Sequence, residues 1–252
     1  MNKIAFNTAN LVARVSGYQF EMKNWGAQHQ KTVAETDEAA WRDICREIAA
    51  CGFAAIEVWE AHAAPESLDE DKAKRWRAIM DEAGLQPIAY AAALRPETVK
   101  VCQWLGIPHM DGGLRLSLDE SIALCHSSGM NFNYENHPER SPQEIMDKIG
   151  DGDAHMGVCI DTGWLGTQGL DAPETIHEMG SWMRHLHLKD VKAIGGHETC
   201  LLGSGIVDIA RCVEVAKANG YDGWYSWEDE PEVRNPFDSA AQNREFIEKL
   251  LA

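Results

Sequence analysis

Four short segments of the 252-residue chain place an acidic or imidazole side chain near the end of an expected strand. The segments read NYENH, VCIDTG, RHLHLKD and WYSWEDE, and the ionisable residues of interest are Glu135, Asp161, His187 and Glu228. Their spacings of 26, 26 and 41 residues each roughly match one strand–helix unit. If successive parallel strands carry them, the four side chains converge at one end of the sheet.

Such a convergence has a chemical consequence. Three carboxylates held close together repel one another, and one would take up a proton unless a cation compensated them. Three oxygen donors and one imidazole suit Mn²⁺ or Mg²⁺, and Co²⁺ and Zn²⁺ also accept such ligands. We therefore predict one divalent metal ion, Mn²⁺ before Mg²⁺, Co²⁺ or Zn²⁺. Taken singly, a strand-end aspartate is usually a helix cap and a lone histidine a core residue; four coincident placements favour the metal site.

The stretch FNYENHPE, residues 132–139, adds a further group. Phe132 and Tyr134 alternate with Asn133 and Glu135, which is the period of a strand with one apolar face and one polar face. His137 stands two residues beyond Glu135 and should share its face. Two interpretations stay open: a general base or acid, since an unperturbed imidazole has a pKa near 6.5, or a hydrogen-bonding residue in the turn at the following proline.

The elements that must position these residues alternate along the whole chain. The expected strands cover 3–10, 53–61, 87–94, 108–112, 131–137, 156–162, 183–190 and 222–229. The expected helices cover 36–51, 67–83, 96–105, 117–129, 141–149, 171–181, 207–219 and 236–251. N-cap signals open several helices, in TDEAAW, SLDED, SLDES and SPQE.

Eight strand–helix units without a composition break predict one α/β domain over 1–252, and a closed (β/α)8 TIM barrel is the simplest architecture. A doubly wound sheet is the alternative, although no GxGxxG follows the first strand. Residues 11–35 form a long connection, which we expect to be a loop at the barrel mouth. Its Tyr18, Phe20 and Trp25 could serve a substrate lid or simply pack.

Composition excludes some function classes. Lys and Arg total 23 against 40 Asp and Glu, for a formal net charge of −17, which disfavours nucleic acid and anionic membranes as partners. The 7 cysteines include no CxxC pair, as expected of reduced thiols. The amino terminus lacks a signal-peptide core, and no run approaches 18 apolar residues. We expect a cytoplasmic protein.

The motifs NYENHPE, DTGWLG, HLHLKDV with LGSGIVD after it, and GWYSWEDE lie in this order along the chain. In them the sequence resembles the xylose isomerase-like superfamily of sugar isomerases and epimerases, over essentially its whole length. The resemblance implies a barrel that binds one divalent ion through Glu135, Asp161, His187 and Glu228. In the ketose epimerases of the superfamily, the first and last glutamates also exchange protons with the sugar. That implies catalytic roles for Glu135 and Glu228, against the alternative that both only bind metal.

Other features resemble C-glycoside deglycosidase catalytic subunits, which cleave 3-oxo-glycosides by β-elimination and use a histidine beside the metal. This resemblance implies a catalytic His137. Two features depart from the ketose epimerase pattern: Trp164 stands where those enzymes commonly carry histidine, and the segment 191–200 offers His197 but no arginine. We therefore expect proton abstraction next to a carbonyl of a sugar or keto-sugar through an enediolate, as an isomerase or epimerase, with a β-eliminating lyase of 3-keto-glycosides as the alternative.

Further residues are candidates for substrate contact. Trp164 could stack on a sugar ring or be structural, and Lys189 could bind a hydroxyl group or pair with a carboxylate. His185 shares the face of His187 but should lie deeper. The remaining candidates lie at or near the ends of strands two and four or after strand seven: Glu57, His62, His109, Arg115 and His197. No basic cluster suggests a phosphate pocket, so the expected sugar is unphosphorylated.

Two other function classes agree less well with the sequence. An AP endonuclease-like nuclease on this barrel needs three zinc ions, more histidines and a basic face, and the charge of −17 argues against it. A non-enzymatic barrel that only binds a sugar is disfavoured by the complete four-residue set. A catalytic chain that forms a homo-oligomer or needs an accessory subunit to close its mouth stays compatible with the sequence.

Overall fold

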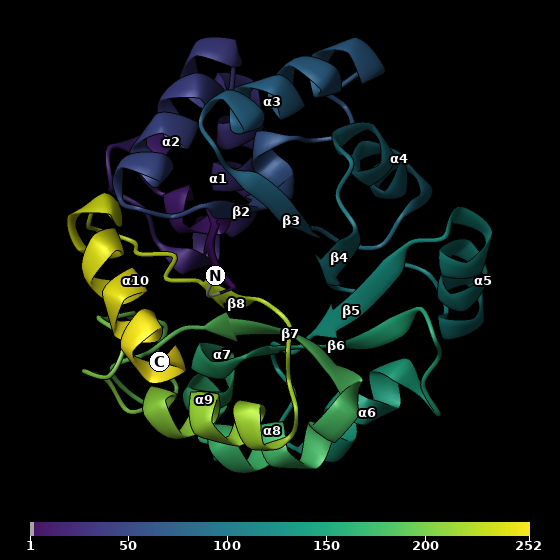
Figure 1. The fold of residues 1–252 in the computed structure, drawn as a ribbon, viewed down its shortest axis with the longest axis vertical. Helices are drawn as coiled ribbons and strands as arrows, with labels where there is room; N and C mark the ends of the chain where they lie inside the picture. The colour runs from purple at the N-terminus through teal and green to yellow at the C-terminus, as the bar shows by residue number, and fades with distance from the viewer. Residues whose placement is uncertain (1–2) are drawn as a thin grey trace.

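The computed structural model describes residues 3–252 as an alternation of short strands and helices (Figure 1). The strands are β1 (Ile4–Asn7), β2 (Ala55–Trp59), β3 (Gln86–Ala91), β4 (His109–Gly112), β5 (Asn131–Glu135), β6 (Met156–Asp161), β7 (Met183–Leu188) and β8 (Tyr225–Trp227). The α-helices are α1 (Trp25–Glu35), α2 (Glu38–Ala50), α3 (Glu70–Glu82), α4 (Pro96–Leu105), α5 (Leu118–Ser128), α6 (Pro142–Ile149), α7 (Thr162–Gln168), α8 (Ala172–Met179), α9 (Ile209–Ala218) and α10 (Phe237–Leu251). The 3-10 turns are η1 (Thr8–Leu11), η2 (Arg14–Ser16), η3 (Met22–Asn24), η4 (Glu60–His62) and η5 (Gly180–Trp182).

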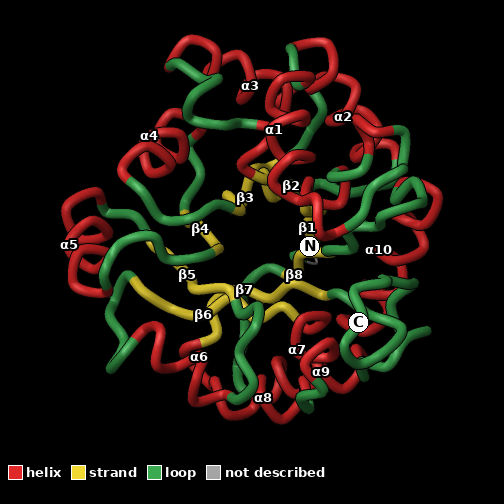
Figure 2. Tube along the Cα trace, turned by 180° about the vertical axis from the view of Figure 1, so that it is seen from behind, coloured by secondary structure: helices red, strands yellow, loops and turns green. Residues whose placement is uncertain are grey.

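The strands form one closed parallel barrel in sequence order. β1 pairs with β8, Ile4 opposite Tyr225 and Phe6 opposite Trp227, and this pairing completes the ring. The helices surround the strands as an outer ring, seen from both sides in Figures 1 and 2. The predicted (β/α)8 barrel is confirmed, and the alternative of an open doubly wound sheet is wrong because the first and last strands are hydrogen bonded.

Outward-facing side chains of the strands pack under the helices. The ring of Phe6 lies 5.3 Å from that of Trp227, 5.4 Å from Phe53 and 5.5 Å from Phe237 of α10. Burial of aromatic rings of this size contributes about 1.5–3 kcal/mol each. This packing between strands and helices fixes the strand backbones, which carry the inward-facing side chains.

The inside of the barrel is divided between small apolar and polar side chains. Ala5, Ala55 and Ala89 of β1–β3 belong to one small buried cluster. The strands β5–β8 carry buried polar side chains, namely Asn133, Glu135, Cys159, Asp161, His185, His187 and Ser226. Buried polar groups cost free energy unless they are hydrogen bonded or hold a ligand, so this half of the interior calls for a chemical explanation.

Residues 11–35, predicted as a mouth loop, contain two 3-10 turns and helix α1. The loop prediction is wrong for residues 25–35 because Trp25 anchors a regular helix, its ring 5.3 Å from Trp59 and 6.1 Å from Phe20. The backbone N–H of Phe20 also donates a hydrogen bond to the carbonyl of Glu232, which follows β8 (3.2 Å). Phe20 and Trp25 therefore pack, as one of the two interpretations expected.

Smaller differences concern element ends. β1 and β2 stop at residues 7 and 59, earlier than predicted, because the turns η1 and η4 take over the chain there. Helix α7 was not predicted, since its sequence TGWLGTQ contains two glycines and directly follows β6. Among residues 3–252, none of the helices has both the length and the hydropathy needed to cross a bilayer.

His62 was predicted as a substrate contact, and the structure places it elsewhere. It is 3% exposed, with its ring 5.6 Å from that of Trp59 and 5.9 Å from that of Trp41. Its Nδ1 lies 3.2 Å from the hydroxyl oxygen of Thr8. The prediction is wrong because the η4 turn directs this side chain among aromatic residues. Burial, with smaller contributions from Arg14 and His29, lowers the pKa of His62 to about 3.

This burial predicts a pH dependence of stability. The unfolded chain protonates His62 near its ordinary pKa of about 6.5, whereas the folded protein does not do so until about pH 3. The contribution of the neutral imidazole is therefore complete above pH 6.5 and decreases as the pH falls. Between pH 7 and pH 5, His62 should lower the free energy of unfolding by about 2 kcal/mol. Urea unfolding of the wild type and His62→Gln at both pH values checks this, and an equal decrease in both proteins would contradict it.

Candidate metal centre

The carboxyl ends of β5–β8 bring together the four predicted ligands. Glu135 and Asp161 are the last residues of β5 and β6, His187 lies near the end of β7, and Glu228 directly follows β8. Each offers one donor atom, and the four atoms lie within 4.8 Å of one another. All four residues are buried. The predicted convergence is present, and the role of these residues as metal ligands is taken up below as a proposal.

His187 occupies the middle of the group. Its Nδ1 lies 3.0 Å from Glu135 Oε1 and 2.5 Å from Glu228 Oε2, and its Nε2 lies 2.9 Å from Glu57 Oε1. The second oxygen of Glu57 accepts a hydrogen bond from the hydroxyl of Ser226 and lies 3.0 Å from Nε2 of His185. An ionised carboxylate can only accept hydrogen bonds, so His187 carries a proton on Nε2.

The groups around Nδ1 of His187 show whether a cation fits between the four side chains. With the proton on Nε2, a neutral imidazole presents the Nδ1 lone pair to the carboxylates of Glu135 and Glu228. Glu228 Oε2 is buried without a hydrogen-bond partner, although it lies 2.5 Å from this nitrogen. Three acceptors that face one another require a second proton or a cation between them. Oxygen donors with one imidazole match the preferences of Mn²⁺, Mg²⁺, Co²⁺ and Zn²⁺, so the residues fit a divalent ion.

The two glutamates have different proton affinities. Burial alone would raise both pKa values. For Glu135 this is outweighed by nearby His137 and His187, which lower its pKa to about 2. For Glu228 burial prevails over Lys189 and His187, and its pKa is raised. Neighbouring carboxyl groups whose pKa values are pushed apart are typical of acid–base sites.

Lys189 joins the carboxylates. Its Nζ lies 3.0 Å from Asp161 Oδ2, 3.6 Å from Glu228 Oε1 and 2.5 Å from Glu230 Oε2. Of the two interpretations of Lys189, the structure shows pairing with carboxylates. Glu230 was not predicted, although the alternation in WEDE puts it on the side of Glu228. The backbone of Glu230 has a positive φ of 50°, which is uncommon for residues other than glycine. Burial raises the pKa of its carboxyl group to about 8.

Aromatic and imidazole rings stand beside this group at the mouth. The ring of Trp164 lies 5.3 Å from that of His137 and 4.7 Å from that of His197. A small cavity of about 10 Å³ lies here, lined by Met22, Gly163, Trp164, Thr167, Lys189, Val191, His197, Thr199 and Glu230. The structure thus brings Trp164, Lys189 and His197 to one cavity, and Met22 of the segment 11–35 contributes to its wall.

The tautomer of His137 follows from its contacts. Nδ1 lies 3.1 Å from the backbone carbonyl oxygen of Glu135, which can only accept, so Nδ1 carries a proton. Nε2 lies 3.7 Å from Glu135 Oε2, beyond hydrogen-bond distance. The side chain is 40% exposed, so its Nε2 is accessible for proton transfer.

Three other predicted substrate contacts are not at the mouth cavity. Glu57 lies in the middle of β2 and is fully buried, where it bridges His185 and His187. His109 is the first residue of β4, so it lies toward the opposite end of the barrel. Arg115 is exposed on the loop after β4. A role of these three residues in substrate binding stays a prediction.

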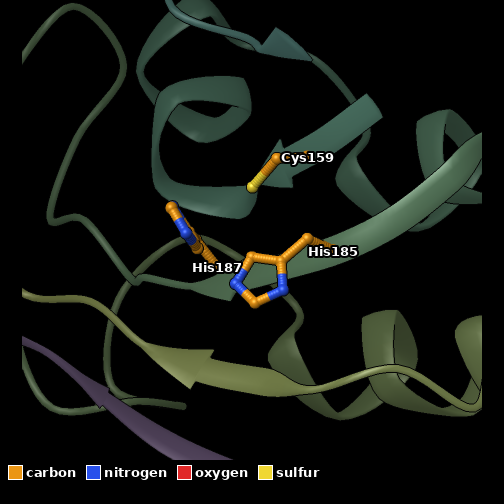
Figure 3. A group of neighbouring side chains, drawn as sticks. All are labelled: Cys159, His185 and His187. Carbon is orange, nitrogen blue, oxygen red and sulfur yellow. The ribbon is translucent and has the colours of Figure 1, made fainter. Parts of the chain in front are cut away.

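Cys159 forms a second grouping with His185 and His187, on the neighbouring strands β6 and β7 (Figure 3). Burial raises the pKa of the Cys159 thiol well above its usual range. A buried neutral thiol is a poor metal ligand, so this grouping is better described as packing beside His187.

A groove of about 660 Å³ lies on the outside of the barrel between α8 and α9. Its lining includes exposed Ile194 and Ile206 but none of the four converging residues. The smaller mouth cavity is lined in part by Lys189, which contacts Asp161 and Glu228 of the converging group.

Glu228 is held in place from the other end of the chain. The side-chain amide of Asn10 donates to the carbonyl of Trp227 (3.1 Å), and its oxygen accepts from the N–H of Asp229 (2.6 Å). Asn10 is fully buried. The peptide groups on both sides of Glu228 are thus attached to Asn10 of η1, the turn that directly follows β1.

Glu57 suggests a test of the support for His187. Replacing it with glutamine leaves one amide NH₂ facing a ring N–H, so one of the two histidines loses its fixed orientation. We expect Glu57→Gln to weaken divalent-ion binding by about 10–100-fold. Isothermal titration with Mn²⁺ measures this, with the exposed Glu82→Gln as control. Unchanged affinity would show that Glu57 does not orient a ligand.

The closed barrel and the donors at its carboxyl end define the class of protein. Residues 109–250 match the sequence model of the xylose isomerase-like TIM barrel, and the chain belongs to this family. The resemblance in the motifs is thereby confirmed.

Among curated relatives, the inosose dehydratase of Geobacillus thermodenitrificans is 27% identical over 146 residues, which cover 49% of this chain and 49% of the relative. That of Clostridium perfringens is 26% identical over 154 residues, 52% of each. The chain spans about half the length of the curated relatives it matches.

Solved structures agree in fold. An L-ribulose 3-epimerase superposes with a TM-score of 0.72 at 14% identity, over 100% of this chain and 95% of the other. A probable 3-DHS dehydratase from Bacillus anthracis gives 0.68 at 14% identity, over 98% of both chains. At this identity the likeness concerns the fold alone.

Proposed function

We propose that this protein is a divalent-metal-dependent lyase of cyclic keto-sugars or keto-polyols. It removes a proton next to a carbonyl group and then expels a β-hydroxyl or β-glycosyloxy group. The observation that carries the proposal is the presence of three proton-transfer groups around one donor set: Glu135, Glu228 and His137. Epimerisation needs two such groups, whereas β-elimination also needs an acid for the leaving oxygen.

The residues have distinct tasks in this reaction. Glu135, Asp161, His187 and Glu228 would hold the ion, which when bound polarises the substrate carbonyl and a neighbouring hydroxyl group as a Lewis acid. Glu135, ionised at neutral pH, takes the proton from the α-carbon. The C–O bond at the β-carbon breaks, and the departing oxygen receives a proton from Nε2 of His137, which enters the step protonated on both ring nitrogens. Transfer of the α-proton from Glu135 to Nε2 after product release restores both groups. The products are an enone and either water or an alcohol.

The surroundings fit a polyhydroxylated ring. Trp164 offers an aromatic face beside His137, suited to stacking on the C–H groups of a pyranose or cyclitol. Lys189 pairs with Asp161 and with Glu230, and both Lys189 and Glu230 line the same cavity. The relatives named inosose dehydratase support elimination of water as the first reaction to test, ahead of cleavage of 3-oxo-glycosides.

Epimerisation is the second candidate, because Glu135 and Glu228 both approach the same nitrogen of His187 from different strands. Two carboxylates on opposite sides of a bound carbon could remove and return one proton. The difference from the lyase is that an epimerase releases no leaving group.

One experiment distinguishes the two candidates. The purified protein with Mn²⁺ is incubated in D₂O with inosose, a 3-oxo-glucoside and a ketohexose, and products are followed by NMR and enone absorbance. The proposal expects an enone and a released hydroxyl compound from one of the first two substrates. Deuterium exchange with a new epimer and no enone would replace the lyase by an epimerase. The absence of both exchange and product would contradict both functions.

A further inference from the structure

A second group of metal-type donors lies inside the barrel, away from the mouth. His109 and Asp111 of β4 and His185 of β7 each offer a donor atom, and these atoms lie within 4.8 Å of one another. His109 Nε2 is 3.7 Å from Asp111 Oδ2, and His185 Nε2 is 4.0 Å from the same oxygen. Asp111 and His185 are fully buried. Glu135, Asp161 and Glu228 of the mouth group take no part in it.

The three residues carry unpartnered polar atoms. His109 Nε2, Asp111 Oδ2 and His185 Nδ1 are buried, and none has a hydrogen-bond partner. Buried polar atoms in folded proteins are nearly always paired, so three orphaned atoms on neighbouring side chains indicate a missing partner. Asp111 has no other cation within hydrogen-bond distance, so a positive partner would offset its desolvation.

The neighbours of these side chains are arranged like supports for metal ligands. Glu57 accepts a hydrogen bond from Nε2–H of His185 (3.0 Å), so that Nδ1 of this ring keeps a free lone pair. Asn133 donates its amide to Asp111 Oδ1 at 2.8 Å and leaves Oδ2 free. A carboxylate behind a histidine, and a donor behind a ligating carboxylate, are the usual supports that orient metal ligands.

We propose that His109, Asp111 and His185 form a second divalent-cation site in the barrel interior, suited to Zn²⁺ or Co²⁺. Two imidazoles and one carboxylate are a common ligand set for these ions. Two ligands on one ion can be at most about 4.2 Å apart when each bond is about 2.1 Å, and the 3.7 Å between His109 Nε2 and Asp111 Oδ2 falls within this limit. His185 brings its donor atom within 4.8 Å of theirs, so a small side-chain shift would complete the set.

The site has a route to solvent. The side chain of His109 is 18% exposed and begins β4, at the end of the barrel opposite the mouth. An ion could therefore load independently of substrate and of the mouth group. Through Glu57, which contacts both His185 and His187, the inner site would be adjacent to the supports of the mouth site.

The test counts ions in matched variants. Wild type, Asp111→Asn, His109→Gln and the double variant Asp161→Asn/Glu228→Gln are stripped of metal, dialysed against Co²⁺ and analysed by mass spectrometry and visible absorbance. We expect about two Co²⁺ per chain in the wild type and about one in each variant. His109→Gln, at a partly exposed position, covers the case that Asp111→Asn does not fold.

The outcomes separate this proposal from the mouth site. If Asp111→Asn and His109→Gln bind as much Co²⁺ as the wild type, the interior holds water or nothing and the inner site is refuted. If they lose one ion while Asp161→Asn/Glu228→Gln loses none, the inner site stands and the mouth site fails. The inner site would be supported directly if the Co²⁺ absorbance persists in Asp161→Asn/Glu228→Gln and disappears when His109→Gln is combined with these two substitutions.

Discussion

Glu228→Gln is expected to lower kcat by about 10²–10⁴-fold while leaving the barrel folded. Glutamine has nearly the volume of glutamate, and the backbone around residue 228 stays attached to Asn10. The amide cannot exchange a proton, and it leaves His187 Nδ1 without one of its two carboxylate neighbours. Turnover is measured at saturating Mn²⁺ with the substrate identified in the D₂O screen, so that weaker ion binding does not account for the loss.

The matched control is Glu214→Gln, an exposed position on α9 that pairs only with Arg211 of its own helix. It should keep the wild-type rate. Near-UV circular dichroism compares the folding of both variants. A rate within about twofold of the wild type in Glu228→Gln would exclude a role for this carboxylate in proton transfer.

Asp161→Asn is expected to remove the ion, and activity with it. Asp161 Oδ1 accepts the N–H groups of Gly163 and Trp164 at 2.7 and 3.1 Å and so caps α7. Asparagine caps a helix equally well, so this substitution keeps the start of α7, although it also removes the ion pair of Asp161 with Lys189. Because changes in residues that only orient metal ligands already cost about 10–100-fold in affinity, loss of a direct ligand should weaken Mn²⁺ binding by more than about 100-fold.

Metal content and thermal stability report this loss independently. In the wild type, Mn²⁺ at about 100 times its dissociation constant should stabilise the folded state by about 2.7 kcal/mol, and a chelator should reverse the shift. Asp161→Asn should show neither effect. An unchanged metal content in this variant would contradict the assignment of Asp161 as a ligand.

The mouth group was predictable because its chemistry coincides with a topological rule. Parallel strands in a barrel end at one face, so residues at four strand ends had to converge once the strands were placed to within about two residues. Glu230 followed from the same alternation that identified Glu228, and it was overlooked only because the strand was assumed to end before it.

Other features depend on packing that no pattern reveals. Glu57 and His109 lie within their strands or at their beginnings, and a shift of two residues along a strand moves a side chain from the mouth to the interior. His62 was misplaced because the η4 turn, not a strand, carries it. Helix α1 was missed because its stability comes from the contact of Trp25 with Trp59, which is distant in sequence.

The bonds of Asn10 on either side of Glu228 join residues 217 or more positions apart. Contacts of such separation close a long loop, and the entropy cost of that closure slows folding. We expect them to form after the intervening units. During synthesis, three of the four converging side chains could be assembled before the last one is delivered by closure of the β1–β8 seam. Ion capture would then mark the completion of folding, and chains that misfold at the seam would remain metal-free. An extension that displaces β1 would impair ion capture from the opposite end of the polypeptide.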